Sequence, residues 1–315
     1  MPSMDSSSYP AESMNIPWVE SPFFEEILAR KKLTAAECEM VRTYNRSGYV
    51  VFDLLDPEEQ SLCDSIINEI APLYQGDRRV MDAWRRNTLV KHLACHPRVL
   101  SALNLLYGRE PFPFQTLNFN IGTEQKTHSD TIHFNSIPQR FMCGVWVALQ
   151  DVTEENGPLH YFEGSHRLPI YSAAEIGFSG ADTPPDVAYK TYYEPFADKL
   201  IAQHNFPKRL GLLKKGQALI WAANLFHGGN PILKRGSTRH SQVTHYYFRD
   251  TVNYTPLRSD FEIGKTLFRA PASILTGSIA PARYLGRPFQ LPLYRRFRAF
   301  VREKLKWTQA GSKNA

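Results

Sequence analysis

Three short segments of this sequence carry side chains that could together bind a metal ion and a small acid. The first holds His128 and Asp130, the second holds His227, and the third holds Arg239 and Ser241. They supply two imidazoles, one carboxylate and one guanidinium. Two imidazoles and a carboxylate on one side of an iron ion leave the opposite positions open for a co-substrate and O₂. The residue types therefore indicate oxidative chemistry at an iron centre.

The spacing of His128 and Asp130 favours a shared ligand role. A strand places alternate side chains on one face, so both residues are expected to point the same way. Of the ten histidines, only His128 is followed two positions later by an acid. His227 is preferred over His240 and His245 as the third ligand, because a strand precedes it and Gly228 follows, which lets the backbone turn close to a ligand. The ordinary alternatives are a surface histidine at 128 and a turn residue at 227.

Arg239 and Ser241 could grip the far carboxylate of a keto-diacid. They are expected to begin the last strand of the core and to share one of its faces. A guanidinium fits a carboxylate with two parallel hydrogen bonds, and the neighbouring hydroxyl adds a third donor. The competing interpretations are an edge-strand arginine in solvent and a clamp at Arg235 instead.

Composition limits the class of protein. The 315 residues are 43% apolar and 22% charged, enough for a sizeable core. No apolar run is long enough for a membrane span, and the first residues lack a secretory pattern. The four cysteines are scattered and are interpreted as reduced thiols of a cytoplasmic protein. The net charge of +6 is concentrated after residue 283, so nucleic-acid binding is not expected.

Helical patterns come first and short strands follow, which predicts an α+β chain with an all-β barrel or sandwich core. The expected division is a disordered segment at 1–20, one domain at 21–280 with an inserted lid at 170–210, and a basic amphipathic tail at 281–315. The expected helices lie at 22–31, 34–46, 57–72 and 97–107, with another inside the lid near 195–203. The expected strands lie at 48–52, 115–120, 141–149, 159–162, 218–221 and 243–248.

An ordered set of motifs resembles the phytanoyl-CoA dioxygenase family of Fe(II)- and 2-oxoglutarate-dependent oxygenases. The resemblance runs from about Gly48 to Phe248. Its motifs are Gly48-Tyr49-Val50-Val51, His128-Ser129-Asp130, Trp146 with Asn156-Gly157-Pro158-Leu159, Gly164-Ser165-His166-Arg167, His227-Gly228 and Arg239-His240-Ser241. No single motif is specific, but the ordered set is.

The resemblance implies a double-stranded β-helix, a jelly-roll or cupin-like barrel, with N-terminal helices packed on one side. It implies Fe(II) held by His128, Asp130 and His227, with 2-oxoglutarate and O₂ as co-substrates. It implies that Arg239 and Ser241 bind 2-oxoglutarate. Trp146, Gln115 and Leu117 are further candidates for the same pocket. The implied reaction is hydroxylation of an unactivated C–H bond in a small organic substrate, such as a natural product, a lipid or an acyl thioester, with release of succinate and CO₂.

Other functions are compatible with the same residues. The first is a jelly-roll metal-binding protein or hydrolase that holds Zn²⁺, and the second is a peripheral membrane protein with a vestigial barrel. Arg239 with Ser241 favours the oxygenase, because a hydrolase needs no carboxylate clamp at that position. The same iron chemistry would also serve desaturation, cyclisation or epimerisation.

Several segments leave their roles open. His133 could touch co-substrate or pack beside Phe134, and the 82–87 loop could grip substrate, although a solvated loop is preferred for it. The lid tyrosines, Tyr189, Tyr192 and Tyr193, could shape the pocket or pack on the surface. The basic tail is expected to form an amphipathic helix that docks on the domain, contacts a membrane surface, or binds an acidic carrier protein.

Overall fold

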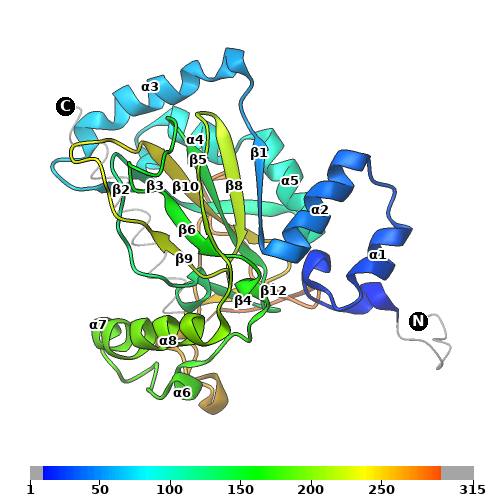
Figure 1. The fold of residues 1–315 in the computed structure, drawn as a ribbon. Helices are drawn as coiled ribbons and strands as arrows, with labels where there is room; N and C mark the ends of the chain where they lie inside the picture. Colours follow the sequence, from blue (N-terminus) through cyan, green and yellow to red (C-terminus); the bar gives the residue numbers. More distant parts are fainter. Residues whose placement is uncertain (1–9, 292–315) are drawn as a thin grey trace.

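A six-stranded antiparallel sheet forms the centre of the computed structural model, which describes residues 10–291 (Figure 1). Two smaller sheets, one of three strands and one of two, complete the β core, and a hairpin lies near the C-terminal end of the described residues. In spatial order, the large sheet contains β1 (Tyr49–Asp53), β8 (Gln217–Ala222), β5 (Met142–Ala148), β10 (Ser241–Phe248), β3 (Pro111–Phe119) and β2 (Arg79–Met81). The smaller sheets contain β7 (Lys208–Leu210), β6 (Leu159–Phe162) and β9 (His227–Gly229); and β11 (Val252–Tyr254) with β4 (Asn135–Ile137). The hairpin pairs β12 (Arg283–Tyr284) with β13 (Arg287–Pro288).

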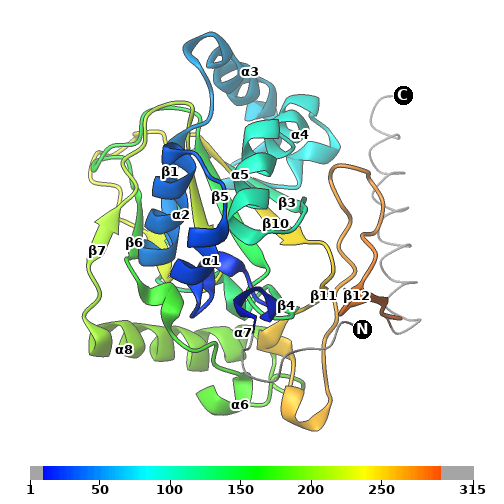
Figure 2. The same cartoon turned by 90° about the vertical axis from the view of Figure 1, so that its right-hand side faces the viewer.

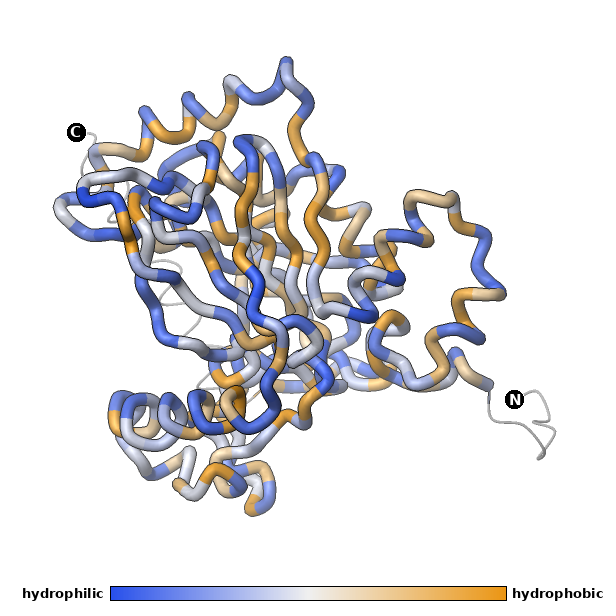
Figure 3. The backbone as a smooth tube through the Cα atoms, viewed as in Figure 1, coloured by the Kyte–Doolittle hydropathy of each residue, from blue (hydrophilic) through white to orange (hydrophobic). Residues whose placement is uncertain are grey.

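Strand β10 separates two chemical environments, because its alternate side chains face opposite sides of the large sheet. Tyr246 and Phe248 belong to the apolar core beneath the helices. Val243 belongs to a second cluster that also contains Trp146 and Trp221. Figure 3 shows how apolar stretches gather along these central strands. The side of β10 that carries Ser241, Val243, His245 and Tyr247 therefore faces the site described below.

The N-terminal helices cover the opposite face of the large sheet (Figure 2). They are α1 (Phe24–Arg30), α2 (Ala35–Ser47), α3 (Ser61–Ile70), α4 (Thr88–Ala94) and α5 (Pro97–Tyr107). The predicted capping box of α2 is present: Thr34 accepts from the Glu37 amide, and the Glu37 carboxylate accepts from the Thr34 amide. Helix α2 ends at Gly48, whose φ of 81° suits glycine. Helix α4 was not expected from the sequence.

The predicted insertion forms a helical layer at one end of the sheets (Figures 1 and 2). It contains α6 (Ala173–Ile176), α7 (Pro185–Val187), a π-helical segment (Ala188–Tyr193) and α8 (Glu194–His204). Its apolar side chains, including Ala188, Tyr193 and Ile201, pack with Ile132 and Phe226 from the segments next to the predicted ligands. The helical layer therefore packs directly against the segments that carry the predicted ligands.

Residues 10–20 differ from the expected disordered segment at 1–20. They form two 3-10 turns, and Trp18 and Val19 are buried. The indole N–H of Trp18 donates to the Leu105 carbonyl over 2.7 Å, and Lys31 lies over the ring. The prediction was wrong here because it rested on the Ser- and Pro-rich composition. A single buried aromatic side chain, Trp18, is enough to hold this segment against the domain. Residues 1–9 lie outside the described part.

The sequence also carried expectations for the 82–87 loop and for the basic tail. The 82–87 loop was expected to be solvated, but Trp84 is buried in the core beneath the helices and Arg85 stacks on its ring. The helix expected in the basic tail lies outside the described residues, so its proposed docking, membrane and carrier-protein roles stay predictions. Within residues 10–291, no helix has the length and apolarity that a membrane crossing requires.

Candidate metal centre

His128 and His227 are joined through their backbones. The His128 amide donates to the His227 carbonyl over 2.9 Å, and the reverse bond is 2.8 Å. Their rings lie 4.6 Å apart. The sequence predicted a strand through 128–130; instead His128 makes this single bridge and Asp130 begins a 3-10 helix, Asp130–Ile132. The expected common direction of the two side chains nevertheless exists, because Ser129 between them is extended.

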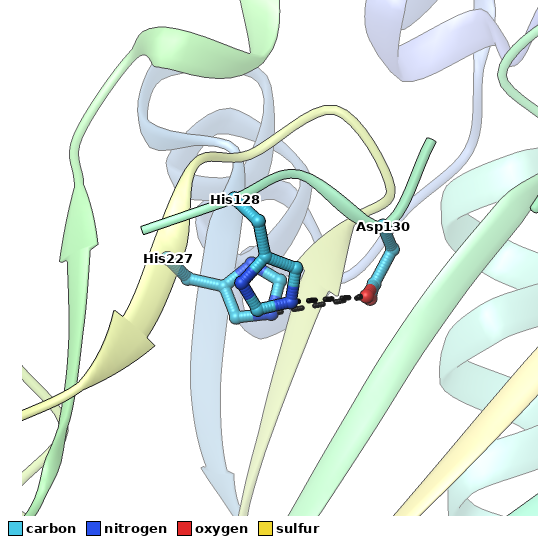
Figure 4. Close-up of side chains that lie close together, drawn as sticks. All are labelled: His128, Asp130 and His227. Atoms are coloured by element: carbon cyan, nitrogen blue, oxygen red, sulfur yellow. Dashed lines mark ion pairs between the residues drawn. The ribbon is translucent and has the colours of Figure 1, made fainter. Parts of the chain in front are cut away.

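Three donor atoms converge in Figure 4. Oδ1 of Asp130 lies 3.8 Å from Nε2 of His128 and 3.9 Å from Nε2 of His227. The three residues are buried and offer ligand atoms within 4.8 Å of one another. An ion placed between them would make bonds of roughly 2–2.5 Å, a suitable length for transition-metal binding to nitrogen and oxygen. The site therefore fits the ion that the sequence implied.

Backbone carbonyls fix the orientation of both imidazoles. Nδ1 of His128 lies 2.9 Å from the Lys126 carbonyl, and Nδ1 of His227 lies 2.9 Å from the Leu225 carbonyl. A carbonyl can only accept, so each Nδ1 carries the proton and each Nε2 presents a lone pair. Metal-binding histidines are commonly held in this way.

Asp130 is held by Trp221 and His245, and the sequence analysis predicted neither contact. Its Oδ2 accepts a 2.8 Å hydrogen bond from the indole of Trp221, and Nε2 of His245 lies 3.6 Å from the same atom. Gly144 makes room for the indole, because a Cβ there would overlap the Trp221 ring. The available signal was the alternation of β8 and β10, which places these side chains on the inner face.

Burial and mutual attraction set the charge states. Burial, with repulsion from His227, lowers the pKa of His128 to about 3, so its imidazole is neutral near pH 7. Burial alone would raise the pKa of Asp130, but attraction to His227 and His245 holds that pKa below its ordinary value. The site at neutral pH therefore contains an ionised carboxylate beside the neutral imidazole of His128.

Arg239 is a buried cation with unused donors. Only 1% of its surface is exposed, and Nε and Nη1 have no hydrogen-bond partner among the described residues. Burial lowers its pKa to about 10, so it remains charged near pH 7. The guanidinium lies 5.2 Å from the Trp146 ring and 5.8 Å from the Phe119 ring. Such a group requires an anionic partner.

Polar groups beside Arg239 are also unsatisfied. Ser241 Oγ and Trp146 Nε1 are buried without a partner in the described part of the chain. The strand begins at Ser241, two residues later than expected, whereas the competing Arg235 is exposed. Together, one guanidinium, one hydroxyl and one indole N–H form a cradle that suits a carboxylate.

The remaining pocket candidates lie on the inner side of β3. Gln115 Oε1 is 2.9 Å from Nδ1 of His245, which connects it to the Asp130 network. Leu117 packs against the cluster that contains Trp146 and Val243. These positions place both residues along the site, while their roles in binding stay predictions.

The helical layer contacts the loop that carries two of the predicted ligands. Tyr193 Oη accepts from the Ser129 amide over 2.8 Å, between His128 and Asp130 in the chain. The Tyr189 ring lies 5.0 Å from that of His133, which also borders Phe134. Tyr192 is exposed and packs on Phe178. Two of the three lid tyrosines thus lie beside the candidate site, and one packs at the surface.

Most of the chain matches a known protein family. The family model described as phytanoyl-CoA dioxygenase (PhyH) matches residues 28–241. An ectoine dioxygenase from Sphingopyxis alaskensis is 25% identical over 219 residues, covering 59% of this chain and 68% of the relative.

Solved structures share the fold. The alpha-ketoglutarate-dependent epimerase SnoN of nogalamycin biosynthesis has a TM-score of 0.56 at 21% identity, covering 82% of this chain and 96% of that one. The carbocyclase SnoK of the same biosynthesis has a TM-score of 0.58 at 18% identity, covering 83% and 95%. At these identities, the likeness establishes the cupin-like architecture and not the reaction.

Proposed function

Because the chain belongs to the phytanoyl-CoA dioxygenase family, we propose that it is an Fe(II)- and 2-oxoglutarate-dependent dioxygenase that hydroxylates a small organic substrate. In the proposed reaction, O₂ supplies one oxygen atom to a substrate C–H bond and one to succinate, and 2-oxoglutarate loses CO₂. Iron supplies this oxidation chemistry when bound. The ectoine dioxygenase and the two nogalamycin enzymes support a small-molecule substrate.

One observation carries the proposal: both imidazoles present their Nε2 lone pairs toward Oδ1 of Asp130. We assign His128, Asp130 and His227 as the iron ligands on this basis. Three ligands on one side leave positions for a chelating co-substrate and O₂. Trp221 would orient the carboxylate by occupying Oδ2, which leaves Oδ1 for the metal.

The proposed role of Arg239 is to orient 2-oxoglutarate. Its unpartnered Nε and Nη1 would donate to the far carboxylate, and Ser241 would add a third hydrogen bond. Trp146 would form a wall of the same cradle. The buried guanidinium would be neutralised only when the far carboxylate of 2-oxoglutarate lies beside it. This pairing would favour a single orientation of the bound co-substrate.

The lid would exclude water from the reacting atoms. Tyr193 closes one side of the ligand loop, and Tyr189 with His133 borders another. Burial lowers the pKa of His133 to about 4, so this imidazole is neutral at pH 7 and can donate or accept one hydrogen bond. No side chain is required as a strong base, because iron held by His128, Asp130 and His227 would supply the oxidation chemistry when bound.

A Zn²⁺ hydrolase or metal-binding protein remains the alternative, since the same three donors also suit Zn²⁺. The cradle around Arg239 favours the oxygenase, because a hydrolytic water would not need a buried guanidinium. We also propose a cytoplasmic location, on the grounds that Cys38, Cys63, Cys95 and Cys143 are all free.

An anaerobic titration separates these functions. The protein is mixed with Fe(II) and then with 2-oxoglutarate, and its visible absorption is recorded. A weak charge-transfer band that decays on admission of O₂, with stoichiometric succinate, is expected. A colourless mixture without succinate, together with tight Zn²⁺ binding, would overturn the proposal and favour the alternative.

A further inference from the structure

The segment after β10 supplies a second cation to the neighbourhood of the candidate metal centre. Arg269 lies beyond residues 28–241, which the family model matches, and its backbone amide donates to the Asn253 carbonyl over 2.7 Å beside β11. Its position is therefore set by this chain's own C-terminal segment, part of which runs along one side of the molecule in Figure 2.

The Arg269 guanidinium stacks on aromatic rings that lead to the predicted iron ligands. It lies 4.7 Å from the Phe134 ring and 6.0 Å from the Phe114 ring. The Phe134 ring is 5.2 Å from that of His245, whose Nε2 is 3.6 Å from Asp130. A short series of contacts thus connects this cation to the metal site.

Arg269 has hydrogen-bonding capacity that residues 10–291 do not use. Nη1 donates to Thr255 Oγ1 over 3.2 Å, while Nε is buried and has no partner among them. No carboxylate of these residues forms an ion pair with Arg269; the acids Asp182, Asp250 and Glu110 pair with other cations. A partly buried guanidinium without a counter-charge loses hydration that an anionic ligand could replace. The charge of Arg269 also reaches His133, where it adds to the effect of burial in lowering that pKa.

Arg239 and Arg269 lie toward opposite ends of the same face of β10. Ser241 is close to Arg239 in the chain, whereas Tyr247 stacks at 4.2 Å on Phe114 beneath Arg269. Ser241 and Tyr247 are six positions apart along the strand, which corresponds to roughly 20 Å. His245 lies between them, beside Asp130. Arg239 therefore lies at one end of the site, and Arg269 lies at the opposite end.

We propose that Arg269 binds an anionic group of the substrate, a carboxylate or a phosphate, while Phe114 and Phe134 pack against its apolar part. This inference rests on the proposed function, because it assigns the substrate to the side of the metal away from the 2-oxoglutarate cradle. The substrate class is then a small apolar or aromatic molecule with one negatively charged end.

Equilibrium dialysis of the Fe(II)- and 2-oxoglutarate-loaded protein under argon tests the assignment. The probes are phenylacetate, phenyl phosphate and the neutral phenylacetamide. At least one anionic probe is expected to bind about tenfold more tightly than the amide. Tight binding of phenylacetate alone would identify a carboxylate-binding site. Tight binding of phenyl phosphate alone would identify a phosphate-binding site.

Arg269→Met is expected to reduce the preference for the anion to less than about twofold, and Arg269→Lys to keep part of it. The matched control is Arg258→Met, which removes an exposed arginine from the same segment and should leave the preference unchanged. Equal binding of all three probes, binding of none, or a preference that survives Arg269→Met would each overturn the inference. In that case Arg269 only stacks on its rings.

The affinity for 2-oxoglutarate is measured in the same dialysis experiment. It distinguishes failure of the proposed role of Arg269 from failure of the proposed dioxygenase function. If the wild-type protein binds 2-oxoglutarate but shows no preference for anionic probes, only the role of Arg269 fails. If it fails to bind 2-oxoglutarate in the presence of Fe(II), the proposed function fails, whatever the anionic probes do.

Discussion

Trp221 donates its indole N–H to Oδ2 of Asp130 over 2.8 Å, so the other carboxylate oxygen faces both imidazoles. The two residues are 91 positions apart in the chain. This bond orients the only acid of the predicted ligand set, and it exists because Gly144 on the neighbouring strand leaves space for the indole.

Trp221→Phe should weaken iron binding without changing the ligands. The variant keeps the ring but loses the hydrogen bond that fixes Asp130, and loss of such a supporting contact typically costs 10- to 100-fold in metal affinity. The iron affinity is measured by titrating the loaded protein with a chelator and recording the chelator concentration at which succinate formation is lost. An affinity equal to that of the wild type would show that the indole contact has no orienting role.

Asp130→Asn should abolish iron-dependent turnover while the fold persists. The substitution removes the carboxylate charge but keeps its shape, so far-UV circular dichroism should be unchanged and succinate formation should fall by more than about 100-fold. Asp186→Asn, at an exposed position in the lid, is the control and should behave as the wild type. Undiminished succinate formation in Asp130→Asn would contradict the ligand assignment.

Arg239→Met should raise the requirement for 2-oxoglutarate. Loss of one partner of a buried charge pair costs about 2–3 kcal/mol, or on the order of 100-fold in apparent affinity. Without 2-oxoglutarate, the variant should melt no lower than the wild type, because an unpaired buried charge has been removed. Thermal melts with and without 2-oxoglutarate measure both effects. Arg235→Met is the matched control, and a larger effect there would move the clamp to that residue.

Tyr193→Phe should loosen the lid from the ligand loop. The Ser129 amide would lose its acceptor, at a cost of about 1–3 kcal/mol for a buried donor left unpaired. A lower melting temperature and faster loss of iron are expected. Tyr192→Phe removes a hydroxyl from an exposed ring and should change neither quantity. If both variants matched in melting temperature and in the rate of iron loss, the hydrogen bond between Tyr193 and Ser129 would not stabilise the lid.

The metal-free protein should lose stability as the pH falls below about 6.5. Burial lowers the pKa of His128 to about 3, and those of His133, His160 and His166 to about 4. The unfolded chain therefore takes up protons first, and the stability present above pH 6.5 decreases through the window from 6.5 to 4. Each histidine contributes up to about 1.4 kcal/mol per pH unit. Urea titrations at pH 7.5 and 5.5 measure the loss; equal midpoints would contradict it.

Local sequence patterns were sufficient for the longer helices and strands and for nominating the site, but not for helix α4 or for short strands such as β2, β7 and β9. Helix α5 begins at Pro97 and ends at Tyr107, as predicted, because proline and a terminal glycine mark its ends through backbone geometry alone. His128 and Asp130 could be nominated because their spacing is local. The strand expected there was wrong, since a single bridge and a 3-10 turn hold the same two side chains together.

The contacts between distant segments were decided only by the tertiary structure. Trp221 against Asp130, Tyr193 against Ser129 and the exposed state of Arg235 depend on how the sheets and the lid pack, which no local pattern encodes. Arg269 gave no signal in the sequence, because one arginine in an irregular segment resembles any other. Residue type and spacing determine which side chains could bind a metal, whereas packing determines which donors converge and which charges are left without a partner.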